Sequence, residues 1–192
     1  PMYWATKQGN LPAVRALLKS GVDANVNMNL KSGFRALHVA AKKGYTALVK
    51  TLIGAGADVD FRARLPVVRK KVLMSMAIYT EGKTPLYLAA EHGATLAVIE
   101  LLKAGADVDI ASDEGKTPLL IAAEWGKYDC VSLLIYAGAD VDWIDDSGNT
   151  AMSLALSYCP REGTSISTSR EKISLKIVKL LKEAERVKRA CA

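Results

Sequence analysis

A five-residue motif, Gly-Ala-Asp-Val-Asp, occurs three times in this chain of 192 residues, starting at Gly56, Gly105 and Gly138. A second motif, Gly-Lys-Thr-Pro-Leu, starts at Gly82 and again at Gly115, which is 33 residues later. The interval from Gly105 to Gly138 is also 33 residues. Two independent motifs that share one period indicate a structural repeat, which restricts the fold to a stack of similar units.

The most regular units, 80–109 and 113–142, each contain Thr-Pro-Leu, an alanine pair, a glycine and a valine at equivalent positions. The threonine can cap a helix, and proline is tolerated in the first turn of that helix. Valine and leucine then recur at helical spacing, which predicts a second helix that ends at the glycine of Gly-Ala-Asp. One such unit cannot bury its own apolar face, so stability should come from stacking on its neighbours.

With these motifs the chain resembles the ankyrin-repeat family, whose pattern has a period of 33 residues, Thr-Pro-Leu-His-x-Ala, a β-turn and two helices. The resemblance implies an all-α ankyrin-repeat solenoid of four full or nearly full repeats behind an N-terminal half-repeat. We expect a single domain over residues 1–192. Its units lie at about 2–29, 30–60, 80–109, 110–142 and 143–189.

Two segments depart from the period and are predicted insertions. Gly56 and Gly105 are 49 residues apart, so 16 extra residues stand between them, in the segment 61–79. This segment is basic at its front and apolar at its back, and is either a solvated loop that packs on a repeat or a projection that binds a partner. The second insertion, 158–170, is rich in small polar residues, which predicts a loop.

A helix is predicted after the second insertion, over about 169–189. Its apolar residues and its lysines fall on opposite sides at helical spacing. A terminal repeat must present a polar face to water, so the lysines are expected to form a capping surface.

The formal net charge of +6 divides unevenly along the chain. Residues 1–60 carry +5, residues 61–79 carry +5, residues 80–159 carry −9 and residues 160–192 carry +5. The molecule is therefore bipolar, and its total charge does not indicate the partner.

Neither a disulfide framework nor a zinc site is indicated by Cys130, Cys159 and Cys191, an odd set without a C-x-x-C motif. A reducing compartment fits this pattern, so we expect the cytoplasm, with the nucleus as the second choice. No apolar run reaches the length of a membrane span, and no secretory signal opens the chain, so we expect no membrane insertion.

No motif for catalysis, for a cofactor or for a metal is recognised in the sequence. Gly82-Lys83-Thr84 ends like a phosphate-binding loop, but the glycine required five residues earlier is replaced by Ala77. His38 and His92 stand in different units without metal-ligand spacing, and His38 is expected to be structural. The aspartates recur with the hairpins and are expected to be turn residues. We therefore expect no enzyme, no cofactor and no metal.

The resemblance implies that a partner binds at the concave groove, formed by hairpin tips and inner helices, through the variable positions of the repeat. Trp125 is the expected anchor because exposed tryptophan is enriched among interface hot spots, and Phe34 and Tyr158 are assigned the same role. The early positions are basic and the late ones mostly acidic. The candidate partner-binding residues are Lys31, Phe34, Lys42, Lys43, Glu91, His92, Asp113, Glu114, Glu124, Trp125, Asp146 and Tyr158.

The first hypothesis is accordingly a monomeric, non-catalytic protein-interaction module that binds a protein or peptide in its groove. The alternative is binding of nucleic acid or another acidic surface through residues 62–71 and 170–189, which would show a steep salt dependence. An enzyme with an unrecognised site is the third hypothesis. The fold by itself does not name the partner.

Overall fold

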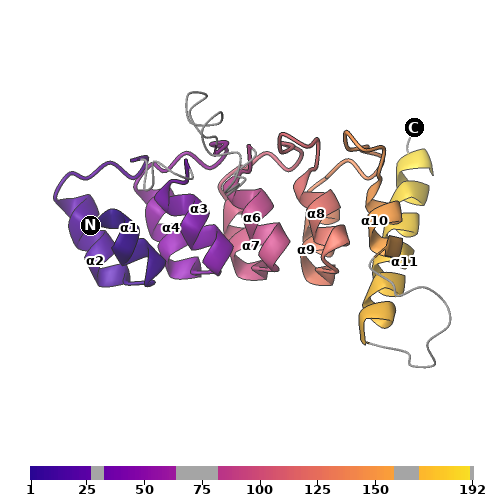
Figure 1. The fold of residues 1–192 in the computed structure, drawn as a ribbon, viewed down its shortest axis with the longest axis horizontal. Coiled ribbons are helices and arrows are strands. Elements are labelled where there is room, and N and C mark those ends of the chain that lie inside the picture. The colour runs from indigo at the N-terminus through magenta and orange to yellow at the C-terminus, as the bar shows by residue number, and fades with distance from the viewer. Residues whose placement is uncertain (27–32, 64–81, 158–168, 191–192) are drawn as a thin grey trace, which may run out of the picture.

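The computed structural model describes residues 1–26, 33–63, 82–157 and 169–190 (Figure 1). No strand forms in these ranges, where an isolated antiparallel bridge joins Ala63 to Lys83. The all-α prediction is confirmed. In chain order the helices are α1 (Met2–Lys7), α2 (Leu11–Lys19), α3 (Ala36–Lys43), α4 (Thr46–Gly54), α6 (Pro85–His92), α7 (Thr95–Lys103), α8 (Pro118–Glu124), α9 (Tyr128–Tyr136), α10 (Ala151–Ser157) and α11 (Ser169–Ala190).

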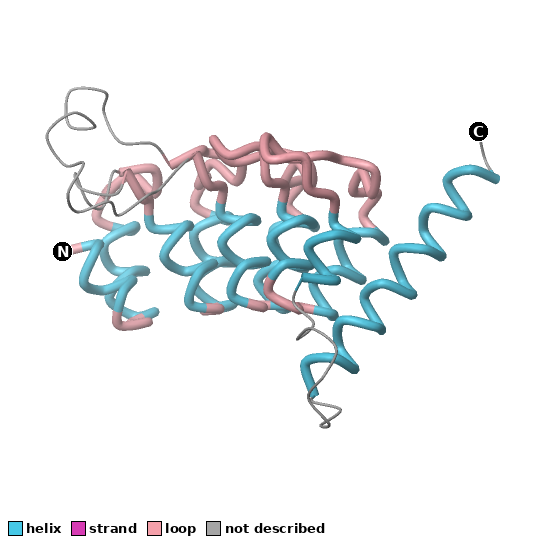
Figure 2. The backbone as a smooth tube through the Cα atoms, turned by 45° about the vertical axis from the view of Figure 1, so that its right-hand side comes forward, coloured by secondary structure: helices cyan, strands magenta, loops and turns pink. Residues whose placement is uncertain are grey.

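The helices form pairs that stack side by side in two layers (Figure 1). The inner layer contains α1, α3, α6, α8 and α10, and each of these helices contacts the next one in the row. The outer layer contains α2, α4, α7, α9 and α11 in the same order. Figure 2 shows the long loops gathered along one edge of the stack. This is the solenoid that the repeat predicted.

Two inner helices begin at the threonine that was expected to cap them. The Thr84 hydroxyl accepts a hydrogen bond from the Tyr87 amide at 3.1 Å, and the Thr117 hydroxyl accepts one from the Leu120 amide at 3.4 Å. Proline follows at the first helical position, where an amide would have no partner inside the helix. Each cap contributes about 1 kcal/mol, so the Thr-Pro motif fixes where the inner helix starts.

Small residues allow the inner helices to approach closely, and branched residues fill the outer layer. The alanine pairs of three inner helices and the recurring valine of four outer helices have no exposed surface. These residues are Ala40, Ala41, Ala89, Ala90, Ala122, Ala123, Val14, Val49, Val98 and Val131. Truncating such a fully buried valine would cost about 1 to 3 kcal/mol, so each unit depends on its neighbours.

A backbone amide that donates to a side chain of the preceding unit links the first four units to one another. The Asp107 amide donates to the Asp60 carboxylate at 3.0 Å, and the Asp140 amide donates to Asp109 at 3.1 Å. In the first unit Asn25 takes the same place and accepts from the Asp58 amide at 2.8 Å. The aspartates of Gly-Ala-Asp-Val-Asp therefore act as turn residues, as predicted, and they also join neighbouring repeats.

The first insertion enters at the tip of a hairpin. In the fourth unit the Ser112 amide donates to the Lys116 carbonyl four residues later, whereas the equivalent bond of the third unit joins Ala63 to Lys83. The larger separation accounts for the 16 extra residues. They stand between Ala63 and Gly82, because Phe61–Ala63 forms the first leg of the hairpin. Residues 64–81 of this insertion lie outside the described ranges.

The last unit ends in a helix much longer than its equivalents. α11 has 22 residues, while α2, α4, α7 and α9 have nine each. Its start at Ser169 confirms the predicted helix, whose buried side includes Ile177 and Leu181. The second insertion, 158–170, lies outside the described residues except for its last two positions.

Candidate protein-binding surface

Ten of the twelve candidate partner-binding residues lie in the described ranges, and Lys31 and Tyr158 lie outside them. The ten occupy the C-terminal ends of the inner helices and the hairpins that precede those helices. We call this region the inner-helix surface. Its members are Phe34, Lys42, Lys43, Glu91, His92, Asp113, Glu114, Glu124, Trp125 and Asp146.

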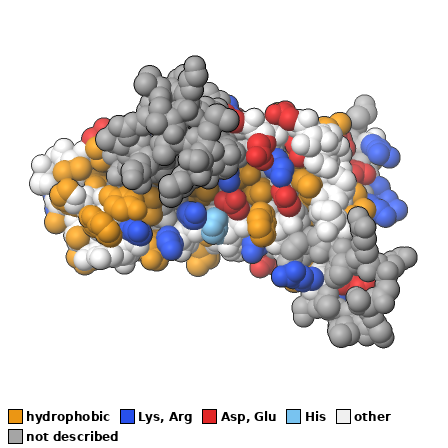
Figure 3. Space-filling model, in the orientation of Figure 1, with side chains coloured by type: hydrophobic (Ala, Val, Ile, Leu, Met, Phe, Trp, Pro, Cys, Tyr) orange, Lys and Arg blue, Asp and Glu red, His pale blue; other side chains and the backbone are white. Residues whose placement is uncertain are grey.

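The N-terminal half of the inner-helix surface is positively charged. Lys43 is exposed and Lys42 half-buried, and neither forms an ion pair with a described residue. His92 lies in the next unit, at the position equivalent to Lys43. Partial burial lowers the pKa of His92, and the charge of Lys42 lowers it further. Figure 3 shows basic side chains and a histidine near the middle of the face drawn, with acidic side chains toward the C-terminal side.

The third and fourth units each contain the same ion pair between a hairpin and an inner helix. Lys83 Nζ lies 3.1 Å from Glu91 Oε1, and Lys116 Nζ lies 2.7 Å from Glu124 Oε2. Burial lowers the pKa of Lys116, but the hydrogen bond to Glu124 and the charge of Glu124 outweigh this, so the pKa is raised. Both glutamates belong to the candidate partner-binding set, and each forms an ion pair with the hairpin lysine of its own unit.

The unpaired acidic groups of this surface lie on the hairpin tips. The Asp146 amide donates to the Glu114 carbonyl at 3.3 Å, which holds two neighbouring tips together. Both side chains are exposed, and neither forms an ion pair with a described residue. Asp113 differs, because its carboxylate lies 3.0 Å from the Arg62 guanidinium. Glu114 and Asp146 are therefore the exposed acidic side chains of the C-terminal half that form no ion pair with a described residue.

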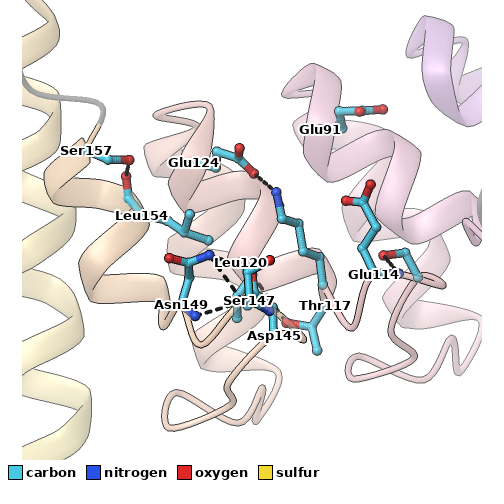
Figure 4. Close-up of polar contacts among 12 residues, drawn as sticks. Glu91, Glu114, Thr117, Leu120, Glu124, Asp145, Ser147, Asn149, Leu154 and Ser157 are labelled. Atoms are coloured by element: carbon cyan, nitrogen blue, oxygen red, sulfur yellow. Dashed lines mark hydrogen bonds and ion pairs between the residues drawn. The ribbon is translucent and has the colours of Figure 1, made fainter.

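A buried aspartate fixes the tip that carries Asp146 (Figure 4). The Asp145 carboxylate accepts hydrogen bonds from the Ser147 amide at 3.0 Å, from the Asn149 amide at 2.7 Å and from the Asn149 side chain. Burial raises the pKa of Asp145, but these hydrogen bonds outweigh it, so the pKa is lowered. The charged tip is consequently held in one conformation.

Trp125 is the large apolar side chain of this surface. It is the C-cap residue of α8, and 51% of its surface is exposed although Ala123, two residues earlier, is completely buried. Trp143 behaves differently, because it is half-buried and donates its indole N–H to the Gly115 carbonyl at 2.9 Å. The expected exposure of Trp125 is confirmed, and its role in binding stays a prediction.

Phe34 does not have the exposure expected of an anchor. It is half-buried and stacks on His38, with the ring centroids 5.5 Å apart. His38 is fully buried, its Nδ1 accepts from the Arg35 amide at 3.2 Å, and its Nε2 lies 2.9 Å from the Phe61 carbonyl. Burial lowers the pKa of His38 to about 4, so the ring is neutral at pH 7 and donates to Phe61. His38 is structural, as predicted.

In the described ranges, no group of three or more His, Cys, Asp or Glu residues could hold a metal ion. Cys130 is buried, and burial raises the pKa of its thiol. In the part of the chain that the structure describes, no helix is both long and apolar enough to cross a membrane.

The Lys–Glu pairs were not recognised in the sequence. A signal was present, because in both regular units a glutamate follows the lysine of Gly-Lys-Thr-Pro by eight residues. The contact of Lys188 with Asp140 and Asp142, at 2.7 and 2.8 Å, was also missed. No spacing rule could find it, because the two parts come from different units.

Fold and surface together define a repeat protein. Its helix pairs stack side by side, and charged and aromatic side chains that differ from unit to unit lie along one face. A family model described as "Ankyrin repeats (3 copies)" matches residues 1–63, 66–145 and 97–189. The chain belongs to the ankyrin-repeat family. Ankyrin repeats are generally non-catalytic modules for protein–protein interaction.

Several curated proteins share the repeats over a short stretch. Palmitoyltransferase AKR1 of Debaryomyces hansenii is 42% identical over 59 residues, which is 30% of this chain and 7% of that protein. Histone-lysine N-methyltransferase EHMT1 of Mus musculus is 36% identical over 59 residues, 31% of this chain and 5% of that protein. The B-cell lymphoma 3 protein homolog of Mus musculus is 43% identical over 58 residues, 30% of this chain and 12% of that protein. The chain therefore spans a small fraction of each of these three relatives.

Proposed function

We propose that this chain binds a protein segment along its inner-helix surface without catalysing a reaction, and that Trp125 is the apolar anchor. The observation that carries the proposal is the half-exposed Trp125 in a layer where the neighbouring alanines are fully buried. Exposed tryptophan gains most from being covered by a partner, since it offers a large apolar area at low conformational cost.

Charge gives the bound segment a direction. The unpaired cations Lys42 and Lys43 lie toward one end of the surface, and the exposed Glu114 and Asp146 lie toward the other. Between them, the two Lys–Glu pairs leave little net charge beside Trp125. The segment is acidic near the lysines, apolar at Trp125 and basic near the hairpin tips. Such complementarity accelerates encounter and fixes orientation more than it adds affinity.

A selection from a random peptide display library tests this proposal with the whole chain as bait. We expect the enriched peptides to contain a large apolar residue between an acidic and a basic stretch. A variant with Glu114→Lys and Asp146→Lys should lose the preference for the basic stretch. Enriched peptides without a charge pattern, together with an unchanged preference in this variant, would remove the inner-helix surface as the site.

The nucleic-acid alternative is less well supported by the described residues. Arg62, which lies in the hairpin leg before the extra residues, already pairs with Asp113, and residues 64–71 lie outside the described ranges. We also propose a monomer in the cytoplasm, with the nucleus as the second compartment. Sedimentation of the purified chain tests the first of these, and imaging of a tagged chain tests the second.

A further inference from the structure

α11 carries a row of exposed cations along one side, with the exposed Glu183 among them. We call this row the basic stripe, and it comprises Lys172, Lys176, Lys179, Lys182 and Arg186. Successive members are three or four residues apart, so they share one side of the helix over about 21 Å. All five are exposed, and none forms an ion pair with a residue in the described ranges.

The basic stripe is held in a fixed direction by contacts on the opposite side of α11. Near the start of the helix, the buried Ser174 hydroxyl donates to the Ala155 carbonyl. Near its end, Lys188 bridges Asp140 and Asp142, and this hydrogen bond lowers the pKa of Asp140. Ile177 and Leu181 are buried between these points. A helix that is secured at both ends presents its cations without a further ordering cost.

Two apolar side chains interrupt the charged surface of α11. Leu175 is 57% exposed and lies one turn after Lys172 and one turn before Lys179. Val187 is 64% exposed and directly follows Arg186. Leu175 also lines a shallow depression together with Val178, Lys179, Lys182, Glu183 and Arg186. Exposure of these apolar side chains to water is unfavourable. The boundary between lipid headgroups and acyl chains accommodates apolar side chains and cations side by side.

α11 also lies where an extended surface can reach it. In Figures 1 and 2 this helix forms the outer edge of the stack, beyond α10, and Figure 3 shows Lys and Arg side chains at the same edge. The basic stripe therefore belongs to the terminal helix of the solenoid, and its member Lys176 lies beside the start of α9.

We propose that the basic stripe of α11 binds the surface of an anionic phospholipid bilayer, with the lysines at the lipid phosphates and Leu175 in the headgroup boundary. Clustered cations beside a helix bind anionic lipid through the surface potential. A nucleic acid fits less well, because α11 has no aromatic side chain to stack on bases and four of its five stripe cations are lysines. This contact is separate from the inner-helix surface and does not require the proposed function.

Flotation of the whole chain with vesicles tests the proposal. We expect binding to phosphatidylcholine vesicles that contain phosphatidylserine, weak binding to pure phosphatidylcholine, and loss of binding as salt is raised. Lys176→Gln with Lys179→Gln should weaken binding about 30-fold, and Leu175→Ser about tenfold. The matched control is Arg15→Gln with Lys19→Gln, which removes two exposed cations from α2 and should change binding less than twofold.

Circular dichroism melts verify that the variants fold, and Lys172→Gln with Lys182→Gln replaces the first pair if that pair melts early. Equal binding to both vesicle types, or equal loss in the α2 control, overturns the proposal. A parallel binding measurement with duplex DNA distinguishes nucleic-acid phosphate from lipid phosphate. If the chain binds duplex DNA at least as tightly as the anionic vesicles and Leu175→Ser does not weaken vesicle binding, the basic stripe is a nucleic-acid site instead.

Discussion

The second unit and the fourth unit have the same backbone arrangement, but different side chains cap their inner helices. In the fourth unit Thr117 caps the inner helix through its hydroxyl, and Leu120 fills the position three residues later. In the second unit Arg35 stands in place of the threonine, and His38 stands in place of Leu120. The His38 Nδ1 accepts a hydrogen bond from the Arg35 amide. The fold therefore tolerates a new capping residue where a second side chain supplies the missing partner.

The two units also differ at the inner-helix surface. Lys42 and Lys43 of the second unit stay unpaired among the described residues, whereas Glu124 of the fourth unit is neutralised by Lys116. The positions that hold the repeat together and the positions that vary in charge are thus separate. Substitutions in the first set are expected to change the free energy of unfolding, and substitutions in the second set are expected to change binding.

The largest effect is expected for His38→Leu, which gives the second unit the residue of the fourth. It leaves the Arg35 amide and the Phe61 carbonyl without their partner in a buried place, which should lower the free energy of unfolding by about 4 kcal/mol. Urea unfolding measures the change. The matched control Leu120→Met keeps the volume at the equivalent position and should cost about 1 kcal/mol or less. Equal costs for both variants would show that His38 acts by packing alone.

A pH dependence of similar origin should follow. The folded pKa of His38 is about 4, below the ordinary 6.5, so the unfolded chain binds the proton more tightly. The stability due to neutral His38 is complete above pH 6.5 and is lost as the pH falls through 4, by about 3 kcal/mol. Carboxylates also titrate there, so the measured quantity is the stability difference between wild type and His38→Leu. It should shrink by about this amount from pH 7 to pH 4, and a constant difference would contradict the account.

A smaller effect distinguishes two tip glycines, because Gly115 lies against the neighbouring hairpin tip and Gly148 faces open space. Gly115 has φ 73°, and an added Cβ would lie 2.8 Å from the Asp146 nitrogen, whereas Gly148 has φ 79° and open space around it. Gly115→Ala should cost about 2 kcal/mol, from backbone strain plus the clash. Gly148→Ala should cost about 1 kcal/mol, from strain alone. Thermal unfolding compares them, and a larger loss in Gly148→Ala would show that the tips do not need their contact.

The smallest effect concerns the ion pairs of the regular units. A double-mutant cycle with Lys116→Met and Glu124→Gln should give a coupling of about 0.5 kcal/mol, because both side chains keep contact with water. Coupling should fall at high salt. A coupling above about 2 kcal/mol would assign these pairs to the scaffold instead of the binding surface.

The sequence was sufficient for the helical repeat, because its signals are local. Thr84 and Pro85 mark a helix start, Ala89 and Ala90 mark the stacked face, and the positive φ of Gly105 follows from its place after the outer helix. The Lys–Glu pairs and the Lys188 contact were not predicted, since they depend on which side chains meet after the units stack. Phe34 was assigned to the surface because its position varies, yet its ring stacks on His38.

The central claim is that a partner is held at the inner-helix surface by Trp125, and binding kinetics of a selected peptide test it directly. Tyr136→Ala is the matched control, because Tyr136 is 93% exposed on the outer helix of the same unit. We predict that Trp125→Ala accelerates dissociation about 30-fold or more and changes the association rate by less than threefold. Tyr136→Ala should leave both rates unchanged. The claim would be contradicted if the peptide dissociated from Trp125→Ala at the wild-type rate. It would also be contradicted if both variants accelerated dissociation equally.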